Sequence, residues 1–172
     1  MPLPSLISLV IFSISLLCVI SGCNKNQNSV SSSNAPVVVS NGMEILNTER
    51  FKSVLQEHNG KVVLVNFFGS WCPPCKAETP DFVQVYEKYK DKNKFVIIGI
   101  AVDQNQSDAL KFVKDFGITY PVYQADSSLL AYFQINPIPT SFVFDKDGSL
   151  LDSMVGYMSK DIVEQIAQYG GE

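Results

Sequence analysis

The chain has 172 residues, of which 46% are apolar and 17% charged, a balance that suits one packed domain with flanking segments. The formal net charge is −4 and Arg50 is the only arginine, which argues against a nucleic-acid partner, because phosphate binding needs clustered basic side chains. His58 is the only histidine, which argues against multi-histidine metal sites. We therefore predict no metal site and no nucleic-acid ligand, and we also expect no cofactor.

The N-terminus has the character of an export signal. Residues 1–24 carry no charged side chain, and the apolar run over residues 6–20 is too short to cross a membrane comfortably. The run is followed by two small residues and then Cys23, which resembles a bacterial lipobox. This resemblance implies a lipoprotein signal peptide over residues 1–22, lost together with Cys18, and a lipid on Cys23. The alternative is an uncleaved anchor helix, and both interpretations place the chain in the bacterial cell envelope, outside the cytoplasm and tied to a membrane.

The next segment is predicted to be a flexible tether. Residues 24–34 are polar except for Val30, so they have too little apolar surface to fold on their own. Residues 36–42 either continue the tether or begin a short edge strand. We divide the chain into a signal peptide (1–22), the lipidated Cys23 with its tether (23–42) and a folded domain (43–172).

Within the domain, helix and strand patterns alternate along the chain. Two nearly unbroken apolar runs, within residues 61–68 and 94–102, predict strands buried on both faces, as in a parallel sheet. Asp147 and Gly148 predict a hairpin turn between two later strands. This order of elements predicts an α/β sandwich with a mixed sheet. The expected helices are 48–57, 72–90 with a kink at Pro80, 107–116, 126–133 and 159–169, and the other expected strands are 121–125, 140–144 and 150–155.

Cys72 and Cys75 carry the strongest chemical signal in the sequence. They follow a buried strand and open a helix, where unpaired N–H groups and the helix dipole lower the pKa of a cysteine and favour the nucleophilic thiolate. We expect the Cys72 sulfur to be exposed and to attack, and the Cys75 sulfur to be tucked into the helix and to resolve the mixed disulfide. Pro73 and Pro74 fit the first helical turn, because its N–H groups have no partner within the helix.

Two other uses of the cysteine pair are weaker. A structural zinc site normally uses four Cys or His ligands, whereas the body of this chain holds one pair of cysteines. A purely structural disulfide suits an exported protein, but so small a ring constrains the unfolded chain little. Redox chemistry is therefore the preferred interpretation.

The residues around the pair match the motifs of a known family. Residues 71–75 fit the pattern WCxxC, residues 76–80 match its KxE-x-P continuation, and residues 138–140 match the loop that holds a cis-proline facing the disulfide. Over about residues 43–170 the chain resembles the thioredoxin superfamily and, within it, the TlpA/ResA-like exported thiol–disulfide oxidoreductases. The resemblance implies a thioredoxin-like three-layer sandwich, with a mixed central sheet flanked by helices and a TlpA-type insertion over residues 103–133.

The resemblance also implies where a substrate binds. Pro139 is expected to be cis and to present the Ile138 backbone as a strand-like clamp beside Cys72, while Pro137 is interpreted as an ordinary loop proline. Phe68, Trp71 and Tyr157 are candidates for an apolar rim that docks a partner, although Phe68 suits the core equally well. The predicted substrate-binding residues are Trp71, Pro73, Pro74, Ile138 and Pro139.

Glu78 is a third candidate catalytic residue. It lies three residues after Cys75, on the same helical face. The resemblance implies a pH-sensitive glutamate here, whereas thioredoxins use a buried aspartate at the position that Asn66 occupies in this chain. We hypothesise that Glu78, directly or through water, deprotonates Cys75 during resolution, and that burial raises its pKa. The alternative is a solvated helix glutamate.

The direction of the reaction is predicted from the residues between the cysteines. Strong oxidants of this family have a histidine there, whereas this motif has two prolines, so we predict a protein disulfide reductase. The resemblance implies a membrane thiol-transfer protein as electron donor and a disulfide-bearing protein substrate, with apocytochrome c as the candidate. One alternative is a peroxiredoxin-like thiol peroxidase, for which the only available arginine is Arg50, in a different helix. The other is a non-catalytic lipoprotein binding module.

Overall fold

The computed structural model describes residues 38–39 and 42–171. The predicted signal peptide, the lipid site at Cys23 and most of the predicted tether lie outside the described residues, so they stay predictions. Among the described residues, none of the helices has both the length and the apolar character that a membrane crossing requires.

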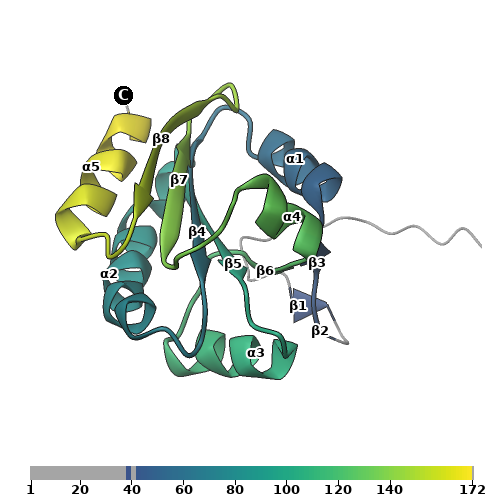
Figure 1. The fold of residues 1–172 in the computed structure, drawn as a ribbon. Helices are drawn as coiled ribbons and strands as arrows, with labels where there is room; N and C mark the ends of the chain where they lie inside the picture. The colour runs from purple at the N-terminus through teal and green to yellow at the C-terminus, as the bar shows by residue number, and fades with distance from the viewer. Residues whose placement is uncertain (1–37, 40–41, 172) are drawn as a thin grey trace, which may run out of the picture. The chain divides into compact units, whose positions relative to one another are not determined.

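A six-stranded mixed sheet forms the centre of the fold, with strand order β3-β6-β5-β4-β7-β8 (Figure 1). The first four strands in this order are parallel to one another, and β7 and β8 are antiparallel additions at one edge. A separate two-stranded ribbon pairs β1 (Val38–Val39) with β2 (Gly42–Met43). The strands of the sheet are β3 (Ile45–Leu46), β4 (Val62–Phe68), β5 (Phe95–Ala101), β6 (Val122–Ala125), β7 (Thr140–Phe144) and β8 (Leu150–Val155).

Helices cover both faces of this sheet, which confirms the predicted three-layer sandwich. Figure 1 shows α2 and α5 on one face and α1 and α4 on the other, with α3 beyond the ends of β4 and β5. Residues 103–133, the predicted insertion, contain α3, β6 and α4, and their origin as an insertion stays a prediction. The helices are α1 (Thr48–Glu57), α2 (Pro73–Tyr89), α3 (Gln106–Asp115), α4 (Ser127–Tyr132) and α5 (Lys160–Gly171), with a short 3-10 turn η1 (Lys90–Lys92) after α2.

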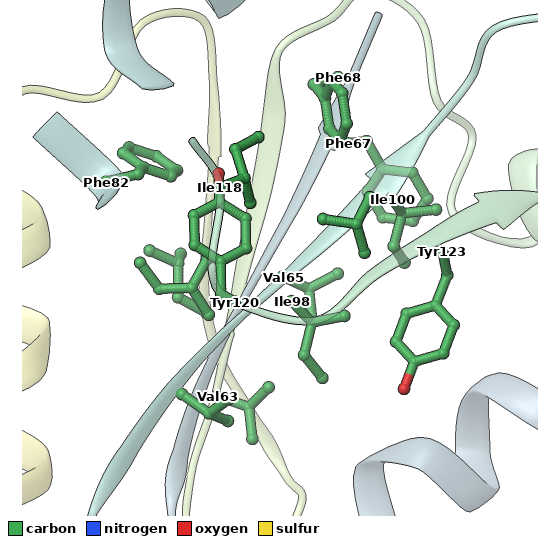
Figure 2. Packing of buried hydrophobic residues seen from close by; sticks show 14 of the residues in the cluster. Val63, Val65, Phe67, Phe68, Phe82, Ile98, Ile100, Ile118, Tyr120 and Tyr123 are labelled. Atoms are coloured by element: carbon green, nitrogen blue, oxygen red, sulfur yellow. The ribbon is translucent and has the colours of Figure 1, made fainter. Parts of the chain in front are cut away.

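The two central strands are buried along their whole length, as their apolar runs predict. All seven residues of β4 and all seven of β5 are buried, and the strands pair in parallel from Val62 opposite Phe95 to Phe68 opposite Ala101. Figure 2 shows Phe82, Ile118 and Tyr120 grouped on one side of these strands, with Phe67, Ile100 and Tyr123 on the other. Each face of the sheet therefore has its own apolar layer.

Alternation along β4 decides what faces the active site. Phe67 points to the side of α1 and α4, where its ring packs 5.3 Å from that of Phe133, measured between centroids. Asn66 points the other way, toward α2 and α5, and is the one polar residue of the strand. Because successive side chains of a strand alternate between faces, the pattern VVLVNFF places this amide directly behind α2.

The start of α2 follows from its sequence. Cys72 is the N-cap residue, and Pro73 and Pro74 occupy the first turn, where a missing N–H costs no helical hydrogen bond. Pro80 lies inside the helix as predicted, and the kink expected there stays a prediction. One turn into the helix the hydroxyl of Thr79 donates to the carbonyl oxygen of Cys75 at 2.7 Å, an added tie beside the position where proline interrupts the backbone ladder.

Candidate active site

Cys72 and Cys75 form a disulfide at the N-terminus of α2. Their Cα atoms are 5.3 Å apart, and the backbone N–H of Cys75 points at the Cys72 sulfur, with 3.3 Å between the nitrogen and the sulfur. In the reduced protein this N–H and the helix dipole favour a thiolate at Cys72. The predicted placement of two sulfurs within bonding reach at a helix start is confirmed.

The predicted exposure of Cys72 is wrong for the disulfide form. Cys72 is only 2% exposed and Cys75 is fully buried. The reason is tertiary, because the carbonyl oxygen of Ile138, from the loop before β7, lies 3.9 Å from the Cys72 sulfur. The exposed surface at the site belongs to neighbours such as Trp71, which is 64% exposed, so a partner meets these side chains before it reaches the sulfur.

The loop beside the disulfide contains two cis peptide bonds. Ile138–Pro139 is cis, as the family resemblance implies. Asn136–Pro137 is also cis, so the interpretation of Pro137 as an ordinary loop proline is wrong. The hydroxyl of Thr140 donates to the Pro137 carbonyl oxygen at 2.7 Å, which ties the loop to the first residue of β7.

Glu78 is buried beneath the disulfide turn, with 1% of its surface exposed. Its Oε1 accepts a hydrogen bond from Asn66 Nδ2 at 2.9 Å, and its Oε2 accepts one from the backbone N–H of Met158 at 2.9 Å. Burial raises the pKa of this carboxyl to about 7, although both hydrogen bonds favour the charged form and oppose the rise. The predicted burial and raised pKa are confirmed, and the alternative of a solvated glutamate is wrong.

The partners of Glu78 extend into the sheet. Asn66 Nδ2 also lies 3.0 Å from the hydroxyl oxygen of Ser141 in β7, so one amide group connects α2 to two strands. Tyr120 is buried nearby, and burial first and the negative charge of Glu78 second raise the pKa of its phenol. Sequence reasoning identified Asn66 only as the residue at the position of the buried aspartate of thioredoxins, one that cannot take up a proton, and did not find its hydrogen bond to Glu78.

A second polar connection holds the turn before the cysteines, and sequence reasoning missed it. Asp103 is 4% exposed, and its carboxylate accepts hydrogen bonds from the Ser70 backbone N–H at 3.1 and 3.2 Å and from the Ser70 hydroxyl at 2.5 Å. The side chain of Gln124 donates to the Asp103 carbonyl oxygen at 2.5 Å. One sequence signal could have revealed this connection. Asp103 follows the buried strand β5 by two residues, and the paired parallel strand β4 ends just before Ser70.

The predicted apolar rim is found in part. Trp71 and Tyr157 are 64% and 48% exposed, whereas Phe68 is buried and stacks on Phe112 with 5.0 Å between ring centroids, so it belongs to the core. Arg50, which a peroxidase would need near Cys72, lies in α1 on the opposite face of the sheet and is held by Glu44 and Glu57 at 2.6 and 2.5 Å. Across residues 38–39 and 42–171, no three His, Cys, Asp or Glu side chains gather closely enough to bind a metal ion.

Comparison with known proteins agrees with this geometry. Residues 59–150 match the family model described as thioredoxin-like. The chain belongs to the thioredoxin-like family. Over 125 residues this thioredoxin-like chain is 33% identical to a thiol-disulfide oxidoreductase ResA of Bacillus cereus, and the matched region covers 72% of each chain.

Solved structures extend the similarity to three dimensions. The thioredoxin-like chain resembles a thiol:disulfide interchange protein of the thioredoxin family from Chlorobium tepidum TLS, with a TM-score of 0.63, 36% identity, and coverage of 68% of this chain and 84% of that one. It also resembles a putative thiol:disulfide interchange protein DsbE from Chlorobium tepidum, with a TM-score of 0.62, 30% identity, and coverage of 69% and 85%. It is a thiol–disulfide oxidoreductase of ResA/DsbE type, with Cys72 and Cys75 as its redox pair.

Proposed function

We propose that this oxidoreductase reduces disulfides of protein substrates outside the cytoplasm, held at a membrane by a lipid on Cys23. The observation that carries the direction is the turn between the two cysteines, where Pro73 and Pro74 offer no ionisable group. Stabilisation of the Cys72 thiolate then comes from the start of α2 without help from a cation between the two cysteines. A dithiol whose thiolate is only moderately stabilised gives up its electrons readily.

The reaction proceeds in two exchanges. In the reduced protein, the Cys72 thiolate attacks one sulfur of the substrate disulfide, the substrate S–S bond breaks, and the released substrate thiolate takes up a proton. The Cys75 thiol then loses its proton and attacks the Cys72 sulfur, which breaks the mixed disulfide and releases the second substrate sulfur as a thiolate that also takes up a proton. Two electrons have passed from the Cys72–Cys75 dithiol to the substrate, and the protein is left as the disulfide seen here.

Glu78 is proposed as the base for the second exchange. Its carboxyl is buried on the helix that carries Cys75, and its pKa of about 7 lies close to neutral pH. A base accepts protons most efficiently when its pKa is near the operating pH. Directly or through water, Glu78 removes the proton of Cys75 when that thiol attacks. In this role Glu78 takes part in the reaction, whereas a glutamate that only supports the fold does not.

The surface around Cys72 is proposed to bind an extended substrate segment. The Ile138 backbone, beside the sulfur and presented by cis Pro139, acts as a strand-like clamp for the segment that carries the substrate cysteine. Exposed Trp71, Pro73 and Pro74 supply apolar contact area around it. Contacts of this kind hold the substrate segment against Cys72, a residue that is itself only 2% exposed.

The cellular setting is proposed from the N-terminal sequence and the family resemblance. Residues 1–22 are the signal peptide, residues 23–42 the lipidated cysteine and tether, and residues 43–172 the catalytic domain. A membrane thiol-transfer protein returns electrons to Cys72 and Cys75, because a reductase in an oxidising compartment must be recharged. The proposed substrate is the CxxCH disulfide of apocytochrome c before haem attachment.

Trapping tests this proposal. In Cys75→Ala, Cys72 attacks a substrate but no resolving thiol follows, so mixed disulfides accumulate, and mass spectrometry identifies the captured protein. Cys72→Ala is the matched control, since it removes the attacking sulfur from the same helical turn and is expected to trap nothing. Equal capture by both variants, or by neither, contradicts the assigned roles.

A further inference from the structure

Two cavities of different character flank the turn that carries Cys72. The first has a volume of about 420 Å³ and is lined by Trp71, Val102, Leu130, Ile135, Ile138 and the loop residues between the last two. None of its lining side chains is charged, and we call it the apolar pocket. The second, of about 260 Å³, includes four charged side chains, Lys76, Asp108, Lys111 and Asp115.

The far wall of the apolar pocket is built by the end of α4. Gln134 adopts a left-handed conformation with φ of 52°, its N–H donates to the Ala131 carbonyl oxygen, and the N–H of Ile135 donates to the Leu130 carbonyl oxygen at 3.0 Å. These two hydrogen bonds form a Schellman motif, in which the residues at the positions of Leu130 and Ile135 commonly make an apolar contact. Both side chains are partly buried against the core, so this wall is fixed before any partner arrives.

The near wall belongs to the redox site. Trp71 immediately precedes Cys72, and the carbonyl oxygen of Ile138 lies 3.9 Å from the Cys72 sulfur. A strand advances about 3.3 Å per residue, so a side chain one or two residues from a cysteine at this sulfur reaches the pocket. The pocket is therefore continuous with the surface on which exchange takes place.

We propose that the apolar pocket binds a large apolar side chain of the substrate, one or two residues from the cysteine that Cys72 attacks, with Leu130 and Ile135 as specificity-determining residues. This inference rests on the proposed function and adds the substrate class to it. A charged or small polar side chain gains nothing in a cavity without charged groups, because it loses its hydrogen bonds to water and finds no charged partner there. The charged cavity on the other flank of the turn fixes the direction of the bound segment, since it disfavours the same apolar residue there.

Matched peptides test the pocket. Two peptides carry the same disulfide and differ only at the residue next to one cysteine, Leu in one and Ser in the other, and stopped-flow mixing with the reduced protein gives second-order rate constants. We expect the wild-type protein to reduce the Leu peptide at least about tenfold faster, the discrimination typical of an apolar pocket. In Leu130→Ser and Ile135→Ser the ratio of the two rates is expected to fall to within about threefold of one.

Two further variants keep the result interpretable. Leu151→Ser is the matched control, because Leu151 is 45% exposed in a separate apolar groove between β8 and α5 and is expected to keep the wild-type ratio. Asn136→Asp places a negative charge at an exposed position of the apolar pocket with no change of side-chain size, so it lowers the ratio even if the serine variants fail to fold.

The outcomes separate the pocket from the proposed function. Reduction of both peptides by the wild type at equal rates overturns the pocket and leaves the reductase intact. Reduction of neither peptide overturns the reductase, and the pocket with it. If light scattering shows that the wild type is a dimer that Ile135→Ser dissociates, the pocket is an interface between copies and the proposal is wrong.

Discussion

Asn66 donates a hydrogen bond to Glu78 across the boundary between the sheet and α2, at 2.9 Å and with both residues buried. A carboxyl in such a place is held by conflicting influences. Burial favours the neutral acid, while the donors from Asn66 and Met158 favour the carboxylate. The balance puts the pKa of Glu78 at about 7, and the carboxyl belongs to a residue one helical turn after Cys75.

Glu78→Gln is expected to slow resolution of the mixed disulfide by about 100-fold, since loss of a general base typically costs about 10²–10⁴-fold. In the wild type the resolution rate rises as pH passes through about 7, where Glu78 loses its proton, and the variant lacks this rise. Stopped-flow measurement of release from a preformed mixed disulfide on Cys72, from pH 5 to 9, gives both results.

The control for this experiment is Glu87→Gln. Glu87 lies on the same helix but is exposed and pairs with Lys90 at 2.6 Å. Its substitution by Gln therefore changes the charge of α2 without altering a residue of the active site. An unchanged rate and pH profile in Glu78→Gln rules out Glu78 as the base.

The same carboxyl predicts how stability depends on pH. Its pKa rises from an ordinary 4.5 to about 7 on folding, so the folded protein holds this proton more tightly than the unfolded chain. The stabilisation of the folded state by this bound proton is fully present below about pH 4.5 and is lost as pH rises to 7. The pKa shift corresponds to about 3 kcal/mol at most in free energy of unfolding. Glu78→Gln, which has no proton to lose, is therefore expected to gain stability relative to the wild type between pH 5 and 8.

Urea unfolding of the wild type and Glu78→Gln, each with its disulfide formed, gives the difference in their free energies of unfolding at each pH in this range. Titrating groups that the two proteins share cancel in this difference. Because the pKa of Glu87 is lowered, Glu87→Gln is not expected to gain stability between pH 5 and 8. A Glu78→Gln difference that is the same at pH 5 and pH 8 shows that the folded protein does not hold this proton more tightly.

The sequence predicted well those elements whose bounds are set by the local pattern of residues. The apolar runs of β4 and β5 and the prolines at the start of α2 are encoded within each segment, and the bounds of these three elements were predicted to within one residue. The strands β2 and β3 were missed, because each has two residues and β3 exists only by pairing with β6. Two residues are too few to show a period of alternation.

The errors at the site have a tertiary origin. The exposure of Cys72 was predicted wrongly because the group that covers its sulfur, Ile138, is 66 residues away in the chain. The hydrogen bond from Asn66 to Ser141 spans 75 residues, and the one from Ser70 to Asp103 spans 33. Cysteine spacing identifies the chemistry, whereas the groups that tune it are brought together only by strand order.

The reduction potential of the Cys72–Cys75 pair is expected to lie nearer the value of thioredoxin, about −270 mV, than the value of the strongest disulfide-forming oxidants, about −120 mV. Pro74→His is expected to raise it, because an imidazolium between the cysteines stabilises the Cys72 thiolate and therefore the reduced form. Equilibration with glutathione buffers measures both proteins. A wild-type value near about −120 mV contradicts the reductase assignment.

Asp103→Asn tests whether the turn before the cysteines depends on a buried charge. The substitution keeps the size of the side chain but replaces a charged acceptor of the Ser70 N–H and hydroxyl, and hydrogen bonds to charged groups contribute about 1.5–3 kcal/mol. Ser70→Ala removes the hydroxyl bond alone and is expected to cost less, about 0.5–1.5 kcal/mol. Urea unfolding of both single variants and the double variant gives the coupling free energy between the two side chains. If the losses of stability in the single variants simply add in the double variant, Asp103 does not act through Ser70. Since Ser70 lies two residues before Cys72, a coupled pair is also expected to show slower attack by Cys72 on a small disulfide in Asp103→Asn than in the wild type.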